Sequence, residues 1–310
     1  MRRIIDAHVH LKEEGLLGTT NQQFQVTYLP YGQIRLFNGL VVDGMPQYMR
    51  NSAFTYDDLI HFMDSMGVEK AMILAGAPTN IEYTVEAVQK YPGRLYGAMT
   101  LKLDDNVENQ IQSYFDRGLT AIKFEMSVLL GYMHPSMYPD FKFNSEILKR
   151  VFRKAGELGI TIVIDPNVPG SKGYQVDELE EVTDEFPGTH VVICHIGQRA
   201  KGLEKDPEKY KLWDRMMRLA RKPNVWFDVS AMPAMFAEEE YPYKTPVAII
   251  HRLMEEYGAD KYIWGSDITS TLVHATYPQM KNMFEKSPLF TDQEKDKLFY
   301  ENALKAYRME

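Results

Sequence analysis

Short apolar runs alternate with longer amphipathic stretches along the whole chain, and this alternation restricts the fold more than any other feature. The runs are rich in Val, Ile and aromatic residues, which favours β-strands. They lie at 4–10, 70–75, 94–101, 119–125, 160–166, 190–196, 224–230 and 261–267. Eight strands that alternate with eight helical patterns are typical of an α/β fold, the closed parallel (β/α)8 or TIM barrel. The alternative is an open doubly wound sheet, but no glycine-rich phosphate loop follows the first run.

The helix-like stretches have recognisable ends. Thr55 stands three residues before Asp58, as in a capping box, and the periodic stretch that follows ends at Gly67. Asn144 opens a second stretch, which ends at Gly159. The remaining helical patterns occupy 80–91, 105–117, 175–186, 206–222, 245–258 and 291–308.

One connection is far longer than a usual loop between a strand and a helix. It spans residues 11–54 and carries several large apolar residues among its glycines: Tyr28, Pro30, Tyr31, Phe37, Met45 and Tyr48. Long loops at the carboxyl ends of barrel strands shape the substrate site, so we expect this insertion to lie over the mouth of the barrel. Its aromatic content argues against a disordered segment.

Charge and cysteine content restrict the class of partner. The chain has 310 residues and a formal net charge of −8, with acidic and basic residues interspersed. This balance argues against nucleic acid or an anionic membrane as a partner and leaves a small molecule. The single cysteine, Cys194, excludes an intramolecular disulfide, and no signal peptide or apolar run of about 18 residues is present. We therefore expect one cytoplasmic domain over residues 1–310.

Two histidines separated by one residue end the first strand. Alternate side chains of a strand share a face, so His8 and His10 point the same way. Two imidazoles at that spacing can both reach one metal ion at about 2.0–2.1 Å. The pair therefore predicts a metal site at the end of the first strand.

Polar residues also end later strands of the predicted barrel. Asp165 ends the fifth strand, where it is either a metal ligand or a turn aspartate before a proline. His195 ends the sixth strand and is either a site residue or a buried, backbone-bonded histidine. If His195 faces the interior, alternation turns Cys194 outward, where it is packing and neither ligand nor nucleophile. In the eighth strand Gly265 permits close backbone approach, and Asp267 lies at the mouth.

Two charged residues of the fourth strand, Lys123 and Glu125, share a face. They form a mutual ion pair, contact substrate or add ligands; a carbamylated lysine that bridges two metals is a further alternative. His134 follows the same strand, on the side of the barrel where a substrate would bind.

In combination these motifs resemble the amidohydrolase superfamily, specifically its amidohydrolase-related branch, which includes aminocarboxymuconate semialdehyde decarboxylase. The resemblance covers the length of the chain. It rests on the matching runs at 6–10, 63–74, 193–197, 224–230, 265–267 and 302–303. It implies a metal-dependent enzyme with one divalent ion, Zn²⁺ as the first expectation and Mn²⁺ as the alternative, and it suggests a homodimer.

The chain departs from that family at one position. The family usually has a metal-binding histidine at the end of the fifth strand, where this chain has Asp165. Asp165 could complete a site with His8, His10 and Asp267. It could instead stand behind a site made of those three residues and a water, or the site could have lost its metal. An anionic oxygen in place of a nitrogen makes harder ions such as Mn²⁺ more competitive with Zn²⁺.

The resemblance predicts a hydrolase in which metal-activated water attacks an amide, lactone or ester carbonyl of a small anionic substrate. Asp267 would accept the proton of the water, and His195 would hydrogen-bond the developing oxyanion. Lys123, Glu125, His134 and Arg199 are the predicted substrate-binding residues.

Two alternatives remain open. One is a metal-dependent, non-oxidative decarboxylase of a small aromatic or unsaturated acid, in which His195 or Asp267 would deliver a proton to carbon. The other is a non-catalytic ligand-binding barrel, since the TIM barrel hosts many functions.

Overall fold

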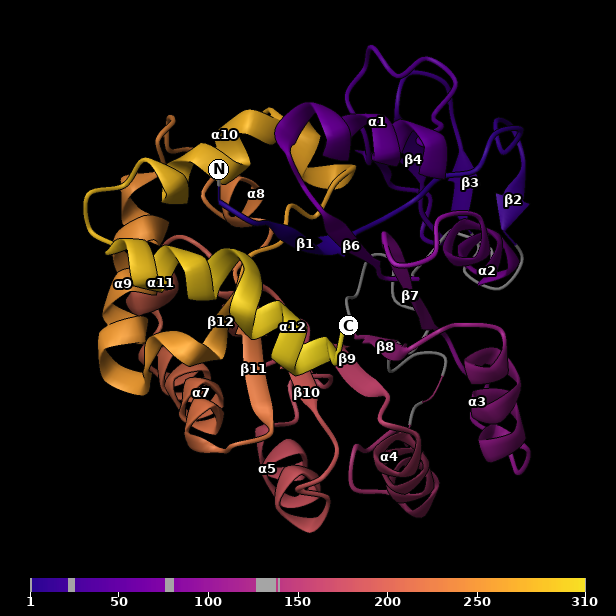
Figure 1. Cartoon of the computed structure of the whole chain (residues 1–310), viewed down its shortest axis with the longest axis vertical. Helices are drawn as coiled ribbons and strands as arrows, with labels where there is room; N and C mark the ends of the chain where they lie inside the picture. The colour runs from indigo at the N-terminus through magenta and orange to yellow at the C-terminus, as the bar shows by residue number, and fades with distance from the viewer. Residues whose placement is uncertain (1, 22–25, 76–80, 127–137, 139, 310) are drawn as a thin grey trace.

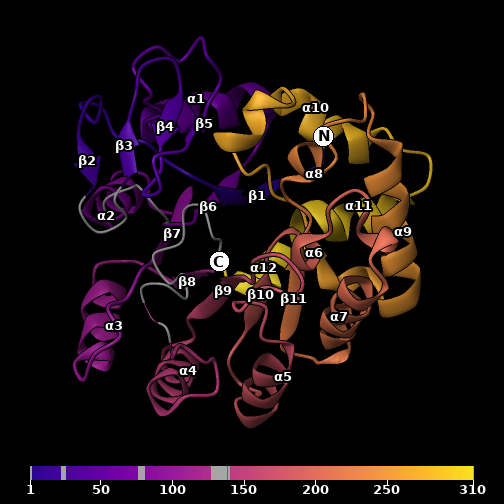
Figure 2. The same cartoon turned by 180° about the vertical axis from the view of Figure 1, so that it is seen from behind.

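Eight parallel strands form one sheet that curves into a barrel with helices on its outside (Figures 1 and 2). The computed structural model describes residues 2–21, 26–75, 81–126, 138 and 140–309. The strands follow the spatial order β1-β6-β7-β8-β9-β10-β11-β12. Their bounds are β1 Ile5–Val9, β6 Lys70–Ile73, β7 Leu95–Met99, β8 Ala121–Glu125, β9 Thr161–Asp165, β10 Val191–Ile193, β11 Val225–Asp228 and β12 Tyr262–Ile263. The predicted barrel is confirmed, and each observed strand lies within a predicted run.

The ring is completed by backbone contacts between β1 and the segment that follows β12. Ala7 N donates to Trp264 O at 3.1 Å, and Asp267 N donates to His8 O at 2.8 Å. His10 N continues the contact to Ile268 O at 2.7 Å. These bonds place the carboxyl end of β1 directly beside Asp267.

The helices form an outer layer around the strands (Figure 1). The α-helices are α1 Tyr56–Met66, α2 Ile81–Lys90, α3 Val107–Asp116, α4 Glu146–Leu158, α5 Val176–Glu185, α6 His195–Gln198, α7 Pro207–Met217, α8 Met232–Met235, α9 Lys244–Tyr257, α10 Tyr277–Glu285, α11 Asp292–Asp296 and α12 Asn302–Tyr307. Five short helical segments complete the layer: η1 Leu203–Lys205, η2 Arg218–Arg221, η3 Ala259–Lys261, η4 Ser270–Val273 and the π-turn η5 Lys297–Glu301.

Most helix ends follow the sequence pattern. Thr55 caps α1, and its hydroxyl and the Asp58 carboxylate form the predicted capping box. Two expectations need correction. The residue before α4 is Ser145 rather than Asn144. The chain also folds into α10, which the pattern did not predict and which begins with a capping box of Thr276 and Gln279.

Two apolar clusters lie on opposite faces of the strands. The larger cluster joins the outer strand face to the helices. The smaller cluster fills the barrel with residues from all eight strands, among them Ala7, Val163 and Trp226. Helix α12 lies across the end of the barrel opposite the mouth (Figure 1), where Thr161 Oγ1 donates to Ala306 O at 2.7 Å. The interior of the barrel is therefore filled with side chains, and a ligand site can form only at the carboxyl ends of the strands.

The insertion after β1 contains an antiparallel sheet that the sequence pattern did not predict. Its strands are β2 Thr20–Asn21, β3 Val26–Tyr28, β4 Gln33–Arg35 and β5 Val41–Asp43, paired in that order. The sheet lies beside α1 and α2, at the side of the barrel where β1 and β6 end (Figures 1 and 2). Lys12 and Phe54 pair through both backbone hydrogen bonds, at 2.8 Å each, and tie the two ends of the insertion together.

Among the helices that the structure describes, none has the length and apolar character needed to span a membrane.

Candidate metal centre

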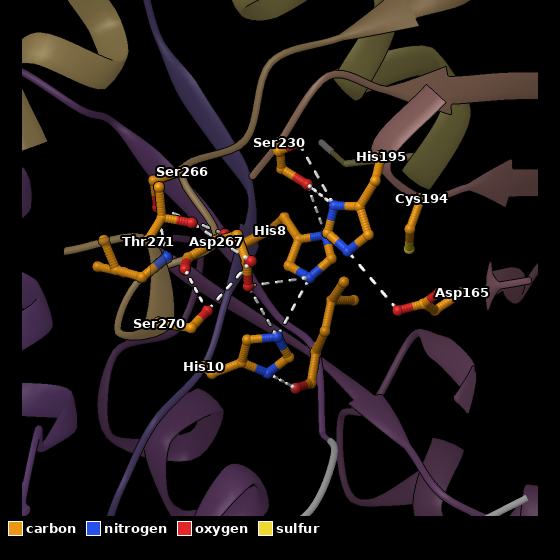
Figure 3. A network of polar contacts seen from close by, with 12 residues as sticks. His8, His10, Asp165, Cys194, His195, Ser230, Ser266, Asp267, Ser270 and Thr271 are labelled. Atoms are coloured by element: carbon orange, nitrogen blue, oxygen red, sulfur yellow. Dashed lines mark hydrogen bonds and ion pairs between the residues drawn. The ribbon is translucent and has the colours of Figure 1, made fainter. Parts of the chain in front are cut away.

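Three side chains converge at the mouth of the barrel, between the ends of β1 and β12 (Figure 3). His8 Nε2 lies 3.1 Å from His10 Nε2. Asp267 Oδ1 lies 3.2 Å from His10 Nε2 and 3.6 Å from His8 Nε2. We call His8, His10 and Asp267 the acceptor cluster. The two histidines share a face as predicted, and Asp267 joins them from the far end of the sequence.

The partners of the two imidazoles determine which nitrogen carries the proton. His10 Nδ1 lies 2.8 Å from Leu74 O, a carbonyl that can only accept. His8 Nδ1 lies 2.9 Å from a carboxylate oxygen of Asp228. Both Nδ1 atoms therefore donate, and a neutral imidazole then has its lone pair on Nε2. Burial lowers the pKa of His8 to about 4, which keeps that ring neutral near pH 7.

The acceptor cluster consequently brings together two nitrogen lone pairs and one carboxylate oxygen. No hydrogen-bond donor from the described residues lies between them, so only a cation or an added proton can make the arrangement favourable. Four ligands at about 2.0–2.1 Å around a tetrahedral Zn²⁺ lie about 3.3–3.4 Å from one another. The three observed separations bracket that value, and the donor set fits a divalent ion.

The charge around the acceptor cluster leads to the same conclusion. Among the described residues, five buried carboxylates and three buried cationic groups lie at this end of the barrel: Asp6, Glu125, Asp165, Asp228 and Asp267, and Lys12, Lys123 and Arg199. An excess of two negative charges in a buried site is costly unless a cation neutralises it. One divalent ion would remove the excess.

Asp228, at the end of β11, holds the His8 ring in position, and the sequence analysis did not predict this role. Its carboxylate is fully buried and accepts hydrogen bonds from His8 Nδ1 at 2.9 Å and from the backbone N of His195 at 2.8 Å. Ser230 Oγ donates to it at 2.5 Å. Burial alone would raise the pKa of Asp228, but the hydrogen bonds from His8 and Ser230 hold it far below its usual range. The signal was present, since an Asp inside an apolar strand needs a partner.

His195 reaches the site through an unusual backbone conformation. The four residues of α6, His195–Gln198, all have positive φ, between 43° and 64°. Such a turn is strained for residues other than glycine. It is held by Trp213 Nε1, which donates to Ile196 O at 2.8 Å, and by Tyr174 OH, which donates to Gly197 O at 3.0 Å. A Cβ at Gly197 would lie 3.1 Å from Met216, so the packing there also favours glycine.

This turn overturns the predicted orientation of Cys194. Alternation would put Cys194 and His195 on opposite faces, but the positive φ of His195 breaks the alternation and both side chains lie at the site (Figure 3). Cys194 is buried inside the barrel, and Lys123 Nζ donates to its sulfur at 3.1 Å. Burial raises the pKa of the thiol well above its usual range. That Cys194 is neither ligand nor nucleophile stays a prediction, because its sulfur also lies near His8 and Asp228.

Asp165 lies beside His195 rather than within the acceptor cluster (Figure 3). Its Oδ2 is 3.7 Å from His195 Nε2. Its Oδ1 accepts from Gln198 Nε2 at 2.5 Å and from the backbone N of Asn167 at 3.1 Å. Burial alone would raise the pKa of Asp165, but the charges of His195 and Lys123 lower it. Its role as a metal ligand remains a prediction.

The other predicted site residues lie at different distances from the centre. Lys123 is fully buried, and its Nζ lies 3.7 Å from Glu125 Oε2, so the two residues form the ion pair that was one of the alternatives. Their role in substrate binding stays a prediction. The Arg199 guanidinium pairs with Glu204 at 2.8 Å, and it lies 5.3 Å from the ring centre of Trp213. His134 falls outside the described residues.

The predicted close approach at Gly265 is confirmed. A Cβ on Gly265 would lie 2.6 Å from His8 Cβ and 3.0 Å from His8 N. Only a residue without a side chain lets the segment after β12 pack against β1 and bring Asp267 to the histidines.

Comparison with protein families and solved structures agrees with this architecture. A family model described as amidohydrolase matches residues 5–309. A probable 2-pyrone-4,6-dicarboxylic acid hydrolase of Acinetobacter baumannii, solved with citric acid bound, is 18% identical, and the match covers 99% of both chains with a TM-score of 0.70.

Two further solved structures have the same fold. A zinc-bound amidohydrolase of Burkholderia multivorans is 14% identical, with 99% of this chain and 100% of that chain covered and a TM-score of 0.71. A 2,6-dihydroxybenzoate decarboxylase from Rhizobium is 13% identical, with 99% of both chains covered and a TM-score of 0.61.

One curated protein, the uncharacterised protein y4mH of Sinorhizobium fredii, is 25% identical over 142 residues. That match covers 44% of each protein, so the chain aligns with less than half of this relative.

Proposed function

The chain belongs to the amidohydrolase family, and on that premise we propose that it is a metal-dependent hydrolase of a small, anionic carbonyl compound. The observation that carries the proposal is the acceptor cluster, in which His8, His10 and Asp267 present lone pairs to one point. These residues would hold one divalent ion, Zn²⁺ or alternatively Mn²⁺. When bound, such an ion polarises a carbonyl and makes water acidic enough to attack it near neutral pH.

Asp267 is the proton acceptor in this proposal. Asp267 is buried, and its Oδ1 faces the two histidines, so in this proposal it is the carboxylate that would contact both the ion and the attacking water. Its Oδ2 accepts from Ser270 Oγ at 3.1 Å and from Thr271 Oγ1 at 3.3 Å. These bonds orient the carboxylate, which can take a proton from the attacking water and return it to the leaving group.

His195 is the oxyanion donor in this proposal. The hydroxyl proton of Ser230 is directed to Asp228, so Ser230 Oγ accepts from His195 Nδ1 at 2.9 Å. The remaining nitrogen, Nε2, faces Asp165 at 3.7 Å, which is too long for a hydrogen bond. In this proposal His195 carries a proton on both nitrogens, and the Nε2 proton is the one that it offers to a substrate oxygen. Asp165 thus acts through His195, and we propose the three-residue metal site over the four-residue one.

The test is a turnover assay on small carboxylic acids that contain an amide, lactone or ester bond. We expect a chelator to abolish hydrolysis and one equivalent of Zn²⁺ or Mn²⁺ to restore it. Asp267→Asn should remove activity, and His195→Ala should lower kcat by about 10²–10³-fold, as loss of an oxyanion donor does. An unchanged rate in His195→Ala would contradict its role.

The same assay in deuterated water separates hydrolysis from decarboxylation. Decarboxylation places a deuteron on carbon, whereas hydrolysis does not. Release of carbon dioxide with deuterium at carbon would replace the hydrolase proposal with the decarboxylase. Ligand binding without metal or turnover would indicate the non-catalytic barrel.

A further inference from the structure

A buried ammonium group next to the acceptor cluster is not used by the proposed reaction. Lys12 follows His10 by two residues, just beyond the end of β1, and enters the insertion. Only 5% of its surface is exposed. Its backbone is fixed to Phe54 at the base of the insertion, so its side chain is directed from a defined point.

The ammonium of Lys12 has no partner among the described residues. No hydrogen bond or ion pair joins its Nζ to another described side chain; its nearest aromatic contact is the ring of Tyr28, with Nζ 6.0 Å from the ring centre. Burial lowers the pKa of Lys12, and the negative charge of Asp267 partly offsets that effect. Because a buried ammonium normally has hydrogen-bond acceptors, this position is incomplete without a ligand.

Tyr28, on β3 of the insertion, presents a second unpartnered group at the same place. Its side chain is 1% exposed, and its hydroxyl has no hydrogen-bond partner within the part of the chain that the structure describes. The aromatic contact puts this residue beside Lys12. The insertion thus contributes two neighbouring buried donors, and neither has an acceptor among the residues that the structure describes.

We propose that Lys12 and Tyr28 form a subsite for a carboxylate group of the substrate. The proposal rests on the proposed function, which it deepens by assigning the anionic group of the substrate to the insertion. A carboxylate carries one negative charge and oxygens that can accept from both an ammonium and a hydroxyl. A phosphate carries nearly two charges and three acceptor oxygens, more than one lysine and one hydroxyl satisfy.

The test measures binding and does not need turnover. Succinate is titrated into the wild-type protein, Lys12→Met and Tyr28→Phe by calorimetry, with neutral succinamide and inorganic phosphate as comparison probes. Lys211→Met, which removes an exposed lysine of α7, is the matched control. Thermal unfolding and metal content are recorded for every variant.

We expect the succinate Kd to rise at least about tenfold in Lys12→Met and about threefold or more in Tyr28→Phe, since bonds to charged groups are the stronger ones. Lys211→Met should bind as the wild type does. An unchanged Kd in a folded Lys12→Met, or no succinate binding to the wild type, would overturn the subsite. Lys12-dependent binding of phosphate that is tighter than that of succinate would overturn the carboxylate assignment.

Different results would contradict the proposed hydrolase function and the proposed subsite. If the wild type held no ion but bound succinate through Lys12, the hydrolase proposal would fail and the subsite would stand. If the protein held an ion and hydrolysed substrates without dependence on Lys12, the subsite alone would fail.

Discussion

Asp228→Asn separates support of the metal site from direct ligation. The substitution keeps the shape of the side chain but replaces one carboxylate oxygen by an amide NH2. One oxygen remains to accept from the backbone of His195 and from Ser230. The NH2 group then faces His8 Nδ1, which now donates to Asp228 at 2.9 Å. Two donors would oppose each other, so the His8 proton moves to Nε2, the nitrogen that faces the acceptor cluster.

The magnitude follows from the bond that is lost. A hydrogen bond to a charged group contributes about 1.5–3 kcal/mol, and about 1.4 kcal/mol corresponds to a tenfold change in affinity. We therefore expect Asp228→Asn to weaken Zn²⁺ binding by about 10–100-fold, the range found when a residue that orients a metal ligand is changed. Competition with a chromophoric chelator measures the dissociation constant directly.

Asp165→Asn is the matched control, because it makes the same chemical change at a buried carboxylate that contacts His195 rather than His8. We expect its Zn²⁺ affinity to remain within about threefold of the wild type. Wild-type affinity in Asp228→Asn would refute the argument from the histidine proton. A loss in Asp165→Asn as large as that in Asp228→Asn would instead show Asp165 to be a ligand.

Three further substitutions test the surroundings of the site. Lys123→Met removes the buried ammonium that lies 3.7 Å from Glu125 and should lower the free energy of unfolding by about 3 kcal/mol. Urea titration measures this loss, and an unchanged midpoint would contradict the pairing. Gly265→Ala places a methyl group against His8, so it should lower the free energy of unfolding by about 1–3 kcal/mol and also lower the metal content. A variant with the full metal content would contradict the tight packing at this position. Thr55→Ala removes the N-cap of α1 and should lower the free energy of unfolding by about 1 kcal/mol, measured by thermal unfolding, while the metal content stays unchanged. Loss of metal in this variant would show that the stability of α1, and not the local geometry, controls the metal site.

The barrel was predictable because local patterns and topology agree. Each barrel strand lies within an apolar run of six to eight residues, the length typical of a buried parallel strand, and the helix ends at Thr55 and Gly159 follow capping rules. Helix α10 was missed although Tyr277, Met280 and Phe284 follow helical spacing and the Thr276–Gln279 capping box marks its start. The sheet of the insertion was missed because its strands have only two or three residues and show no useful alternation.

The site was predictable only as far as strand alternation holds. His8 and His10 follow it, and their shared face is a direct consequence of the spacing. His195 does not follow it, because the chain turns through four successive residues with positive φ and the His195 side chain is redirected toward the site. The pattern of an apolar strand does not predict such a turn. Asp228 binds a histidine 220 residues away, a pairing that only the closed barrel creates.

The central claim is that His8, His10 and Asp267 hold one divalent ion, and elemental analysis of the purified protein tests it most directly. We predict about one ion per chain in the wild type after incubation with Zn²⁺ or Mn²⁺, the same content in Asp165→Ala, and loss of the ion in His10→Ala. A wild-type protein that holds no ion under those conditions, or a His10→Ala variant that keeps it, would contradict the account.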